Sequence, residues 1–309
     1  VPQHPLLMVS GASGSGKSSV VRAGLLPQLA QRVQGFRAFK MKPGGDPFVA
    51  LKYGLVGGAL KENKIGFAAT AHPDTLVKLA AMRPKGECWL LFVDQFEEMF
   101  TLCDAAEKRS AFFAGLLSLA AACPPELRVV LTMRSDFFDR FDLYPELLEQ
   151  VRRGLLFVTS PTADELRQCI EQPAAQHGVV FEDGLVSQII SEIHGRPGTL
   201  PLLQYMLDLL WHEDNPVSDK TLNKSSYLAI QGVKGALCQR ADMVYACRDD
   251  APRSEASVKG RPRAEAALPH ALDSSPWTTT VRNRSPRSFR RSGPSIRYTD
   301  DRSSPDFAG

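Results

Sequence analysis

The chain has 309 residues, of which 43% are hydrophobic, and a formal net charge of +3 at pH 7. This length allows about two domains of ~100–200 residues each. The positive excess lies after residue 247, where 12 basic residues accompany 8 acidic ones, whereas the first 247 residues hold 25 basic and 26 acidic residues. A neutral folded part excludes strong electrostatic attraction to nucleic acid or to an anionic membrane, so nucleic acid is not an expected partner.

The apolar runs and the cysteines indicate the compartment. The longest apolar run, 111–123, is shorter than the ~20 residues that span a bilayer, so no membrane segment is expected. The six cysteines are scattered without a C-x-x-C pair, which is typical of buried thiols in a reducing compartment. We therefore expect a cytoplasmic protein. Because the chain starts at Val1 directly before a strand, we expect it to be a piece of a longer protein.

Residues 1–160 alternate short apolar strands with helical periodicity, which is typical of a parallel α/β sheet. Helices are predicted over Ser18–Val33, Pro47–Lys61 and Lys108–Ala122 from leucine, phenylalanine and valine at helical spacing. Five strands are predicted, over Leu6–Val9, Phe36–Met41, Cys88–Val93, Leu127–Met133 and Leu155–Val158. The first domain is thus predicted to be an α/β unit with a five-stranded parallel sheet.

From residue 161 the pattern becomes helical, and residues 161–247 are predicted to form an all-α domain that ends at the start of a winged-helix-like segment. Breaks are expected at Pro173, at 195–198 and near Pro216. The predicted helices are Ala163–Glu171, Gly184–Ile193, Leu200–Trp211 and Lys234–Tyr245.

Residues 248–309 form an Arg/Ser/Pro-rich tail without hydrophobic periodicity. Such a segment buries too little apolar surface to offset its ordering entropy, so we predict a disordered tail. Its large apolar residues, Trp277 among them, are isolated. Removing the tail is therefore expected to leave the melting temperature nearly unchanged.

A complete G-x-x-x-x-G-K-[ST] motif occupies residues 11–18, between the first strand and the first helix. Glycines in this loop are expected to adopt positive φ and to turn backbone N–H groups toward the phosphates of a nucleotide. Lys17 is expected to contact the β- and γ-phosphates, and the Ser18 hydroxyl to bind Mg²⁺. The expected nucleotide-binding residues of this Walker A motif are Gly11, Ser13, Gly14, Ser15, Gly16, Lys17, Ser18 and Ser19.

The strand Leu90–Val93 ends in Asp94, as a Walker B strand does. A carboxylate at this place holds Mg²⁺, so Asp94 is the second predicted metal-binding residue. Many P-loop ATPases place a water-activating glutamate directly after this aspartate, whereas Gln95 follows it here. Glu97 or Glu98 is then the candidate that orients water, with helix N-terminal acidic residues as the structural alternative. Slow hydrolysis is expected.

The strand Val129–Met133 leads into Arg134, Ser135 and Asp136. In P-loop ATPases with an extra strand between the Walker A and Walker B strands, a polar residue at its end senses the γ-phosphate, and a guanidinium matches phosphate oxygens. Arg134 is therefore the predicted sensor. An ordinary surface pair between Arg134 and Asp136 is the alternative.

These residues together resemble the novel STAND NTPase family, whose members often precede WD-repeat propellers in bacterial proteins. The resemblance implies Lys17 and Ser18 as phosphate and Mg²⁺ ligands, Asp94 as the Walker B acid and Arg134 as the sensor. It also implies that Pro201 lies near the adenine, the alternative being a first-turn helix proline. Besides the phosphate loop, the resemblance rests on KPGGDP (42–47), VDQFEEMF (93–100), VVLTMRSDFFDR (129–140), IEQPAAQHGVVFEDGL (170–185), GTLPLLQYMLDLLW (198–211) and QGVKGALCQRADMVY (231–245).

The resemblance predicts an ATP- and Mg²⁺-dependent signalling switch with slow hydrolysis, in which hydrolysis of ATP or exchange of ATP and ADP changes the relative position of the two domains. Protein partners are expected through C-terminal repeats outside this chain, together with a nucleotide-dependent oligomer. One alternative is an ATP-binding scaffold without hydrolysis, which Gln95 leaves open. The other is a DNA-handling ATPase related to replication initiators, which the neutral charge of the first 247 residues disfavours.

Overall fold

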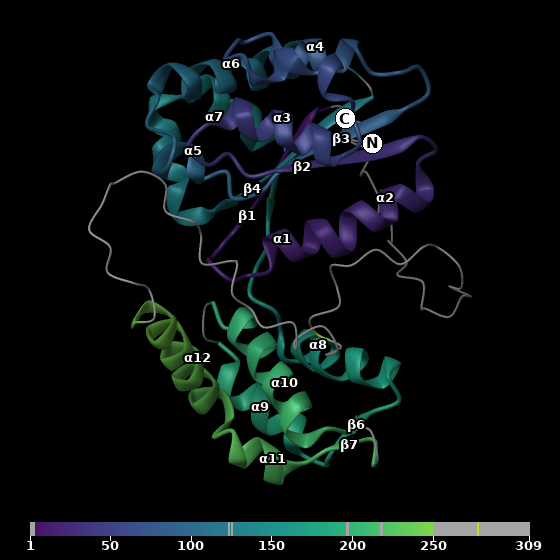
Figure 1. Cartoon of the computed structure of the whole chain (residues 1–309), viewed down its shortest axis with the longest axis vertical. Helices are drawn as coiled ribbons and strands as arrows, with labels where there is room; N and C mark the ends of the chain where they lie inside the picture. Colours follow the sequence, from purple (N-terminus) through teal and green to yellow (C-terminus); the bar gives the residue numbers. More distant parts are fainter. Residues whose placement is uncertain are drawn as a thin grey trace, which may run out of the picture.

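The computed structural model describes residues 4–249, apart from 123, 125, 196, 197, 217 and 218, together with Trp277. Figure 1 shows two units, one built around a sheet and one of helices. We name them the sheet domain (residues 4–160) and the helical domain (residues 161–249). Each has its own cluster of buried apolar side chains.

The sheet domain contains the predicted five-stranded sheet, and every strand pairing in it is parallel. The strand order is β2-β3-β4-β1-β5, so β4 lies between the strand that precedes the phosphate loop and the strand that ends at Asp94. All five strands therefore end at one edge of the sheet, where the candidate residues gather. The strands are β1 (Leu6–Gly11), β2 (Phe36–Met41), β3 (Cys88–Val93), β4 (Leu127–Arg134) and β5 (Leu155–Phe157).

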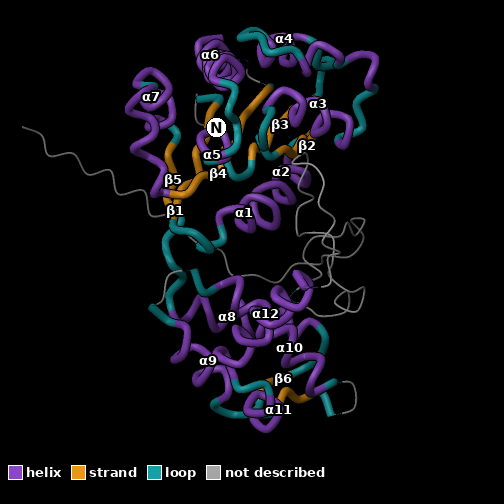
Figure 2. The backbone as a smooth tube through the Cα atoms, turned by 60° about the vertical axis from the view of Figure 1, so that its left-hand side comes forward, coloured by secondary structure: helices purple, strands orange, loops and turns teal. Residues whose placement is uncertain are grey.

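Both faces of the sheet are covered by helices (Figures 1 and 2). Along β3, Trp89, Leu91 and Val93 belong to the larger apolar cluster, and Leu90 and Phe92 to the smaller one, because successive strand residues point to opposite faces. The smaller cluster packs on one continuous helix formed by α1 (Lys17–Ser19), the π-helical turn η1 (Val20–Leu25) and α2 (Leu26–Arg32). The larger cluster packs on α3 (Pro47–Gly57), α4 (Thr75–Ala81), α6 (Ala106–Ala122) and α7 (Pro145–Arg153).

Short elements complete this domain: the 3₁₀ helices η2 (Glu62–Lys64), η3 (Gly66–Ala69) and η4 (Ser135–Leu143), and α5 (Glu98–Thr101). Helix α3 ends at Gly57, earlier than predicted. Gly57 and Gly58 are poor helix formers, and Ala59 has φ of 66°, which turns the chain away. The carboxylate of Asp46 begins α3 by accepting from the N–H groups of Phe48 (3.0 Å) and Val49 (3.1 Å).

The helical domain contains α8 (Ala163–Gln176), α9 (Leu185–Ile193), α10 (Leu200–Asp214), α11 (Lys224–Ala229) and α12 (Gly232–Asp249). It adds a two-stranded parallel sheet of β6 (Val180–Phe181) and β7 (Thr221–Leu222), which the helical pattern did not predict. The predicted break at Pro173 is wrong, because α8 continues through this residue to Gln176. Leu166, Ile170 and Ala174 are buried on both sides of Pro173, so packing of this face outweighs the lost N–H bond.

Most of the predicted tail, residues 250–276 and 278–309, lies outside the described residues, but Trp277 does not. Its side chain is buried in the core of the helical domain, 5.8 Å from the ring of Trp211 and 6.2 Å from that of Phe181. Its carbonyl oxygen accepts from Nε2 of Gln204 at 3.0 Å. The expectation that Trp277 stands apart from the folded part is therefore wrong for this residue.

The structure agrees with the sequence on membrane-spanning helices, and only in part on the burial of the cysteines. In the part of the chain that the structure describes, no helix combines the length and the apolar character needed to cross a bilayer. Cys103 is buried as expected, whereas Cys169 and Cys238 are exposed. Cys169 lies on α8 outside the buried face of that helix, so an apolar sequence neighbourhood did not imply burial.

Candidate functional site

The phosphate loop connects β1 to α1 and contains two backbone conformations that favour glycine. Gly14 has φ of +70° and Gly16 has φ of +88°. Gly11 lies at the end of β1 and is not among the residues with positive φ, contrary to the prediction. A Cβ at Gly11 would lie 2.4 Å from the carbonyl oxygen of Val158, so close backbone approach explains this glycine.

Lys17 begins α1 and is largely buried. Its Nζ donates to the carbonyl oxygens of Gly11 (3.0 Å) and Ala12 (2.7 Å). Burial lowers the pKa of Lys17, and the nearby carboxylate of Glu97 opposes this shift. The loop thus holds a cationic side chain against its own backbone. This side chain lies at the N-terminus of a helix, where backbone N–H groups favour an anion.

Asp94 is 3% exposed and its carboxylate accepts from three side chains. The hydroxyls of Ser18 and Thr132 donate to Oδ1, each at 2.6 Å. Nη2 of Arg22 donates to Oδ2 at 2.6 Å and forms an ion pair. The two predicted metal-binding residues, 76 positions apart, are therefore in direct contact.

The donor set fits magnesium, because a hydroxyl and a carboxylate are the hard oxygen ligands that this ion prefers. The sequence predictions missed Arg22 and Thr132. Arg22 follows Ser18 by four positions, so both lie on one face of the helix. Thr132 is a hydroxyl residue in an otherwise apolar stretch of β4. These two signals are visible in the sequence once Asp94 is known to lie beside them.

Glu97 and Glu98 have different surroundings. Glu97 lines the cleft at the phosphate loop, where burial raises the pKa of its carboxyl and the N–H of Arg134 donates to Oε2 at 3.4 Å. The carboxylate of Glu98 instead accepts from the N–H of Gly44 at 2.9 Å. Glu98 thus ties the start of α5 to the loop that contains the KPGGDP sequence. Gln95, between strand and helix, has φ of 57°.

Arg134 forms the predicted surface pair and also lines the cleft at the phosphate loop, so its role as a sensor stays a prediction. Its Nε and Nη2 donate to the two carboxylate oxygens of Asp136 at 3.0 and 2.5 Å, so the surface pair exists. Arg134 also lines the cleft beside Lys17 and pairs in register with Gly11 across β4 and β1. Arg134 therefore lines the cleft at the phosphate loop, and its guanidinium is held by the exposed carboxylate of Asp136.

The cleft has a volume of about 370 Å³ and is walled by both domains. Pro201 lies in the first turn of α10, as the structural alternative predicted, and it also lines this cleft. Segments that are far apart in the sequence thus face one another. The lining residues are Ser13, Gly14, Gly16, Lys17, Ser18, Ser19, Gln95, Glu97, Thr132, Arg134, Leu200, Pro201 and Gln204.

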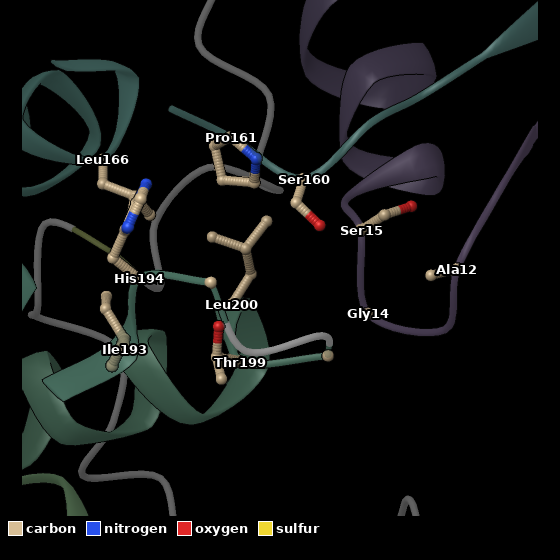
Figure 3. A pocket seen from close by; sticks show the side chains of 12 residues that line it. Ala12, Gly14, Ser15, Ser160, Pro161, Leu166, Ile193, His194, Thr199 and Leu200 are labelled. Atoms are coloured by element: carbon tan, nitrogen blue, oxygen red, sulfur yellow. The ribbon is translucent and has the colours of Figure 1, made fainter. Parts of the chain in front are cut away.

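A second, narrower cavity is also lined by Gly14 (Figure 3). The loop residues Ala12, Gly14 and Ser15 form one side, and Leu200 of α10 lies between them and the side chains of Ile193 and His194. Gly14 and Leu200 line both cavities, so the two meet there. The volume is about 20 Å³. The remaining lining residues are Ser160, Pro161, Leu166, Ile193, His194, Gly195, Gly198 and Thr199.

The two domains touch at Gly14. A Cβ at this residue would lie 2.8 Å from the Cα of Gly198, so two glycines allow the backbones of the loop and of the helical domain to meet. Gly198 itself has φ of +73°. Gly198 was not predicted as a site residue, because its contact with the loop depends on how the domains are placed.

Comparison of the structure with solved structures gives matches among origin-recognition proteins. The Aeropyrum pernix ORC2 protein in its ADPNP–ADP complexes is 16% identical, with a TM-score of 0.56 over 76% of this chain and 62% of that chain. The ADP form of the same protein is 15% identical, with a TM-score of 0.54 over 76% of this chain and 62% of that chain. The A. pernix ORC1 protein in complex with DNA is 15% identical, with a TM-score of 0.47 over 75% of this chain and 59% of that chain.

At these identities the likeness shows the fold alone, a parallel sheet with helices on both faces followed by a helical domain. The chain spans less than two thirds of the length of these structures. No curated protein matches the chain by sequence.

The family model described as novel STAND NTPase 1 matches residues 1–258. This range includes the phosphate loop, Asp94, Arg134 and the α10 segment that closes the cleft. The match agrees with the resemblance seen in the DQFEE and LPLL blocks. The chain therefore belongs to the novel STAND NTPase 1 family, whose members are nucleotide-binding P-loop NTPases.

Proposed function

We propose that this protein binds ATP with Mg²⁺, hydrolyses it slowly and uses the nucleotide to set the relative position of its two domains. One observation carries the proposal: residues of the phosphate loop and of the first turn of α10 line the same cleft. A ligand in that cleft contacts both domains at once. It therefore favours whichever domain arrangement it fits better.

The residues at this edge of the sheet have different proposed roles toward the phosphates. Lys17 and Arg134 supply positive charge to phosphate oxygens, and the loop N–H groups orient them. Ser18 and Asp94 would hold Mg²⁺, which neutralises charge that develops on the phosphates when bound. Glu97 is the candidate that orients the attacking water, because its carboxylate lies in the cleft with Lys17 whereas Glu98 is bonded to Gly44.

The adenine base of ATP is proposed to bind in the narrow cavity beside Gly14, whose lining is apolar at Leu166, Ile193 and Leu200. A volume of about 20 Å³ holds about one water and is far smaller than a purine ring. Binding the base there requires Gly198–Leu200 to move away from the loop. Pro201 contacts the nucleotide from the larger cleft in this proposal, one residue from Leu200.

The scaffold without hydrolysis is the second candidate. Gln95 occupies the position after Asp94, and the carboxylate of Glu97 already accepts from the N–H of Arg134. A cytoplasmic location is proposed from the cysteine pattern and the short apolar runs. Protein partners through segments outside this chain and a nucleotide-dependent oligomer are proposed from the family resemblance. That nucleic acid is not a partner stays a prediction.

Binding is tested with Lys17→Ala by titration calorimetry with ADP and with ATP. A hydrogen bond to a charged group contributes ~1.5–3 kcal/mol, so we expect the variant to lose at least ~10-fold in affinity for the nucleotide. The matched control is Lys85→Ala, which removes the same charge from an exposed loop position and should leave affinity unchanged. Equal affinity of the Lys17→Ala variant and the wild type would refute nucleotide binding at this loop. Single-turnover measurements with ATP then separate the slow ATPase from the scaffold.

A further inference from the structure

The contact between Arg22 and Asp94 concerns the charge of the metal site. Arg22 lies in the π-helical turn η1, four positions after Ser18, and its Nη2 is 2.6 Å from Oδ2 of Asp94. Ser18 bonds the other oxygen of the same carboxylate at 2.6 Å. One buried carboxylate is thus shared between a residue expected to bind the metal and a cation of the protein itself.

Two observations indicate that this placement of Arg22 is not its most favourable one. Its Nε is buried and has no acceptor among the described residues, which costs free energy for a polar group. The turn that carries it has the wider π-helical spacing, with the N–H of Leu26 bonded to the carbonyl oxygen of Val21. Single π-helical turns are uncommon and occur frequently at functional sites.

A divalent cation beside Ser18 and Asp94 would lie close to the guanidinium. The positive charges of the cation and of the guanidinium would repel each other strongly, because the site is partly buried. The repulsion is reciprocal, since whatever weakens metal binding in the presence of Arg22 also weakens the Arg22–Asp94 pair in the presence of the metal.

We propose that Arg22 competes with Mg²⁺ for the Asp94 carboxylate, so that binding of metal with nucleotide displaces the guanidinium and rearranges the turn at 20–25. Arg22 is a positioning residue that sets the metal requirement of the site. This inference rests on the proposed nucleotide binding.

The test is the ratio of ADP affinities with Mg²⁺ and with EDTA, measured by calorimetry on the full chain. Arg22→Met removes the competing charge at similar side-chain length, and we expect its ratio to rise at least ~10-fold above that of the wild type. Arg32→Met, at the exposed end of α2, is the matched control for net charge and should keep the wild-type ratio. Arg22→Lys retains the charge and should stay within about threefold of the wild type. If Arg22→Met does not fold, Arg22→Gln replaces it.

Combination with Asp94→Asn completes the experiment. Without the carboxylate only the direct repulsion between the guanidinium and the cation remains, so adding Arg22→Met to Asp94→Asn should raise the ratio by less than the same change does in the wild-type background. An unchanged or lower ratio in Arg22→Met alone would overturn the competition. Loss of ADP binding by the wild type in both EDTA and Mg²⁺ would instead refute the proposed function, so the two failures are distinguishable.

Discussion

At the scale of single residues, the environment of a carboxylate decides what it can do. Glu97 and Glu98 are adjacent and chemically identical, yet Glu97 lines the cleft at the phosphate loop and Glu98 accepts a hydrogen bond from the N–H of Gly44. Burial raises the pKa of Glu97 above the ordinary 4.5. A carboxylate must be ionised to orient or deprotonate water, so this shift would connect the burial of Glu97 to the pH range of the proposed hydrolysis.

We predict that Glu97→Gln lowers the single-turnover rate of ATP hydrolysis by ~100-fold or more, the typical contribution of a positioned acid or base. In the wild type the rate should fall as the pH falls through the raised pKa of Glu97, at a higher pH than for an ordinary glutamate. Glu97→Gln should lose this pH dependence and keep its ADP affinity.

Glu98→Gln is the matched control, with the same chemical change on the next residue. Its rate should stay within about threefold of the wild type, since its side chain bonds the backbone of Gly44. If Glu98→Gln lowers the rate and Glu97→Gln does not, the assignment is reversed. If the wild type binds ATP but shows no turnover, the scaffold is the correct function.

At the scale of an element, α3 illustrates how a family sequence block acts through structure. The KPGGDP block supplies Gly44, whose N–H bonds Glu98, and Asp46, which caps α3 and pairs with Lys108. Burial alone would raise the pKa of Asp46, but hydrogen bonds from Lys108, Val49 and Phe48 outweigh it and lower the pKa below 3.8. The block thus joins three helices near the sheet edge.

We predict that Asp46→Ala lowers the free energy of unfolding by ~1 kcal/mol, the typical value of an N-cap, measured by urea denaturation. Because the folded-state pKa is lowered, this contribution is complete above the unfolded-state pKa and is lost as the pH falls through the folded-state pKa. The difference between wild type and variant should therefore shrink on acidification.

Asp74→Ala is the control for Asp46→Ala. Asp74 occupies the same position at the start of α4, but its side chain makes no capping hydrogen bond. Its loss should cost less than ~0.5 kcal/mol, as for surface substitutions. Equal losses in the two variants would show that the cap at Asp46 contributes nothing specific.

At the scale of the whole molecule, Trp277 links a distant part of the chain to the helical domain. Trp277 is 8% exposed and packs against Phe181 and Trp211, and its carbonyl oxygen accepts a hydrogen bond from Gln204, which also lines the cleft at the phosphate loop. A buried indole contributes substantially to stability through its large apolar area. The position of Trp277 therefore predicts that part of the region after residue 249 stabilises the domain.

We predict that Trp277→Ala lowers the free energy of unfolding of the helical domain by ~3 kcal/mol, the lower end for truncating a buried Trp. Deleting residues 248–309 should cause a comparable loss, and Trp277→Phe a smaller one because it retains an aromatic contact. Circular dichroism melting of the four proteins provides the measurement. An unchanged melting temperature after both truncation and Trp277→Ala would restore the sequence-based expectation of an independent tail.

Local patterns sufficed for much of this protein. The strands β1 to β5 were predicted within a few residues, and the phosphate loop was identified from its glycines, Lys17 and Ser18. The contact of Ser18 with Asp94 was also predictable, because parallel strands end at one edge of a sheet. These features depend on residues that are close in sequence or on a rule of chain topology.

The tertiary structure decided the rest. The continuation of α8 through Pro173, the burial of Trp277 and the bond of Glu98 to Gly44 depend on packing between segments far apart in sequence. So does the pairing of Arg22 with Asp94, 72 positions away. A sequence pattern reports the preference of a local segment, whereas the partner of a buried charge or ring is chosen by which segments the completed fold brings within contact distance.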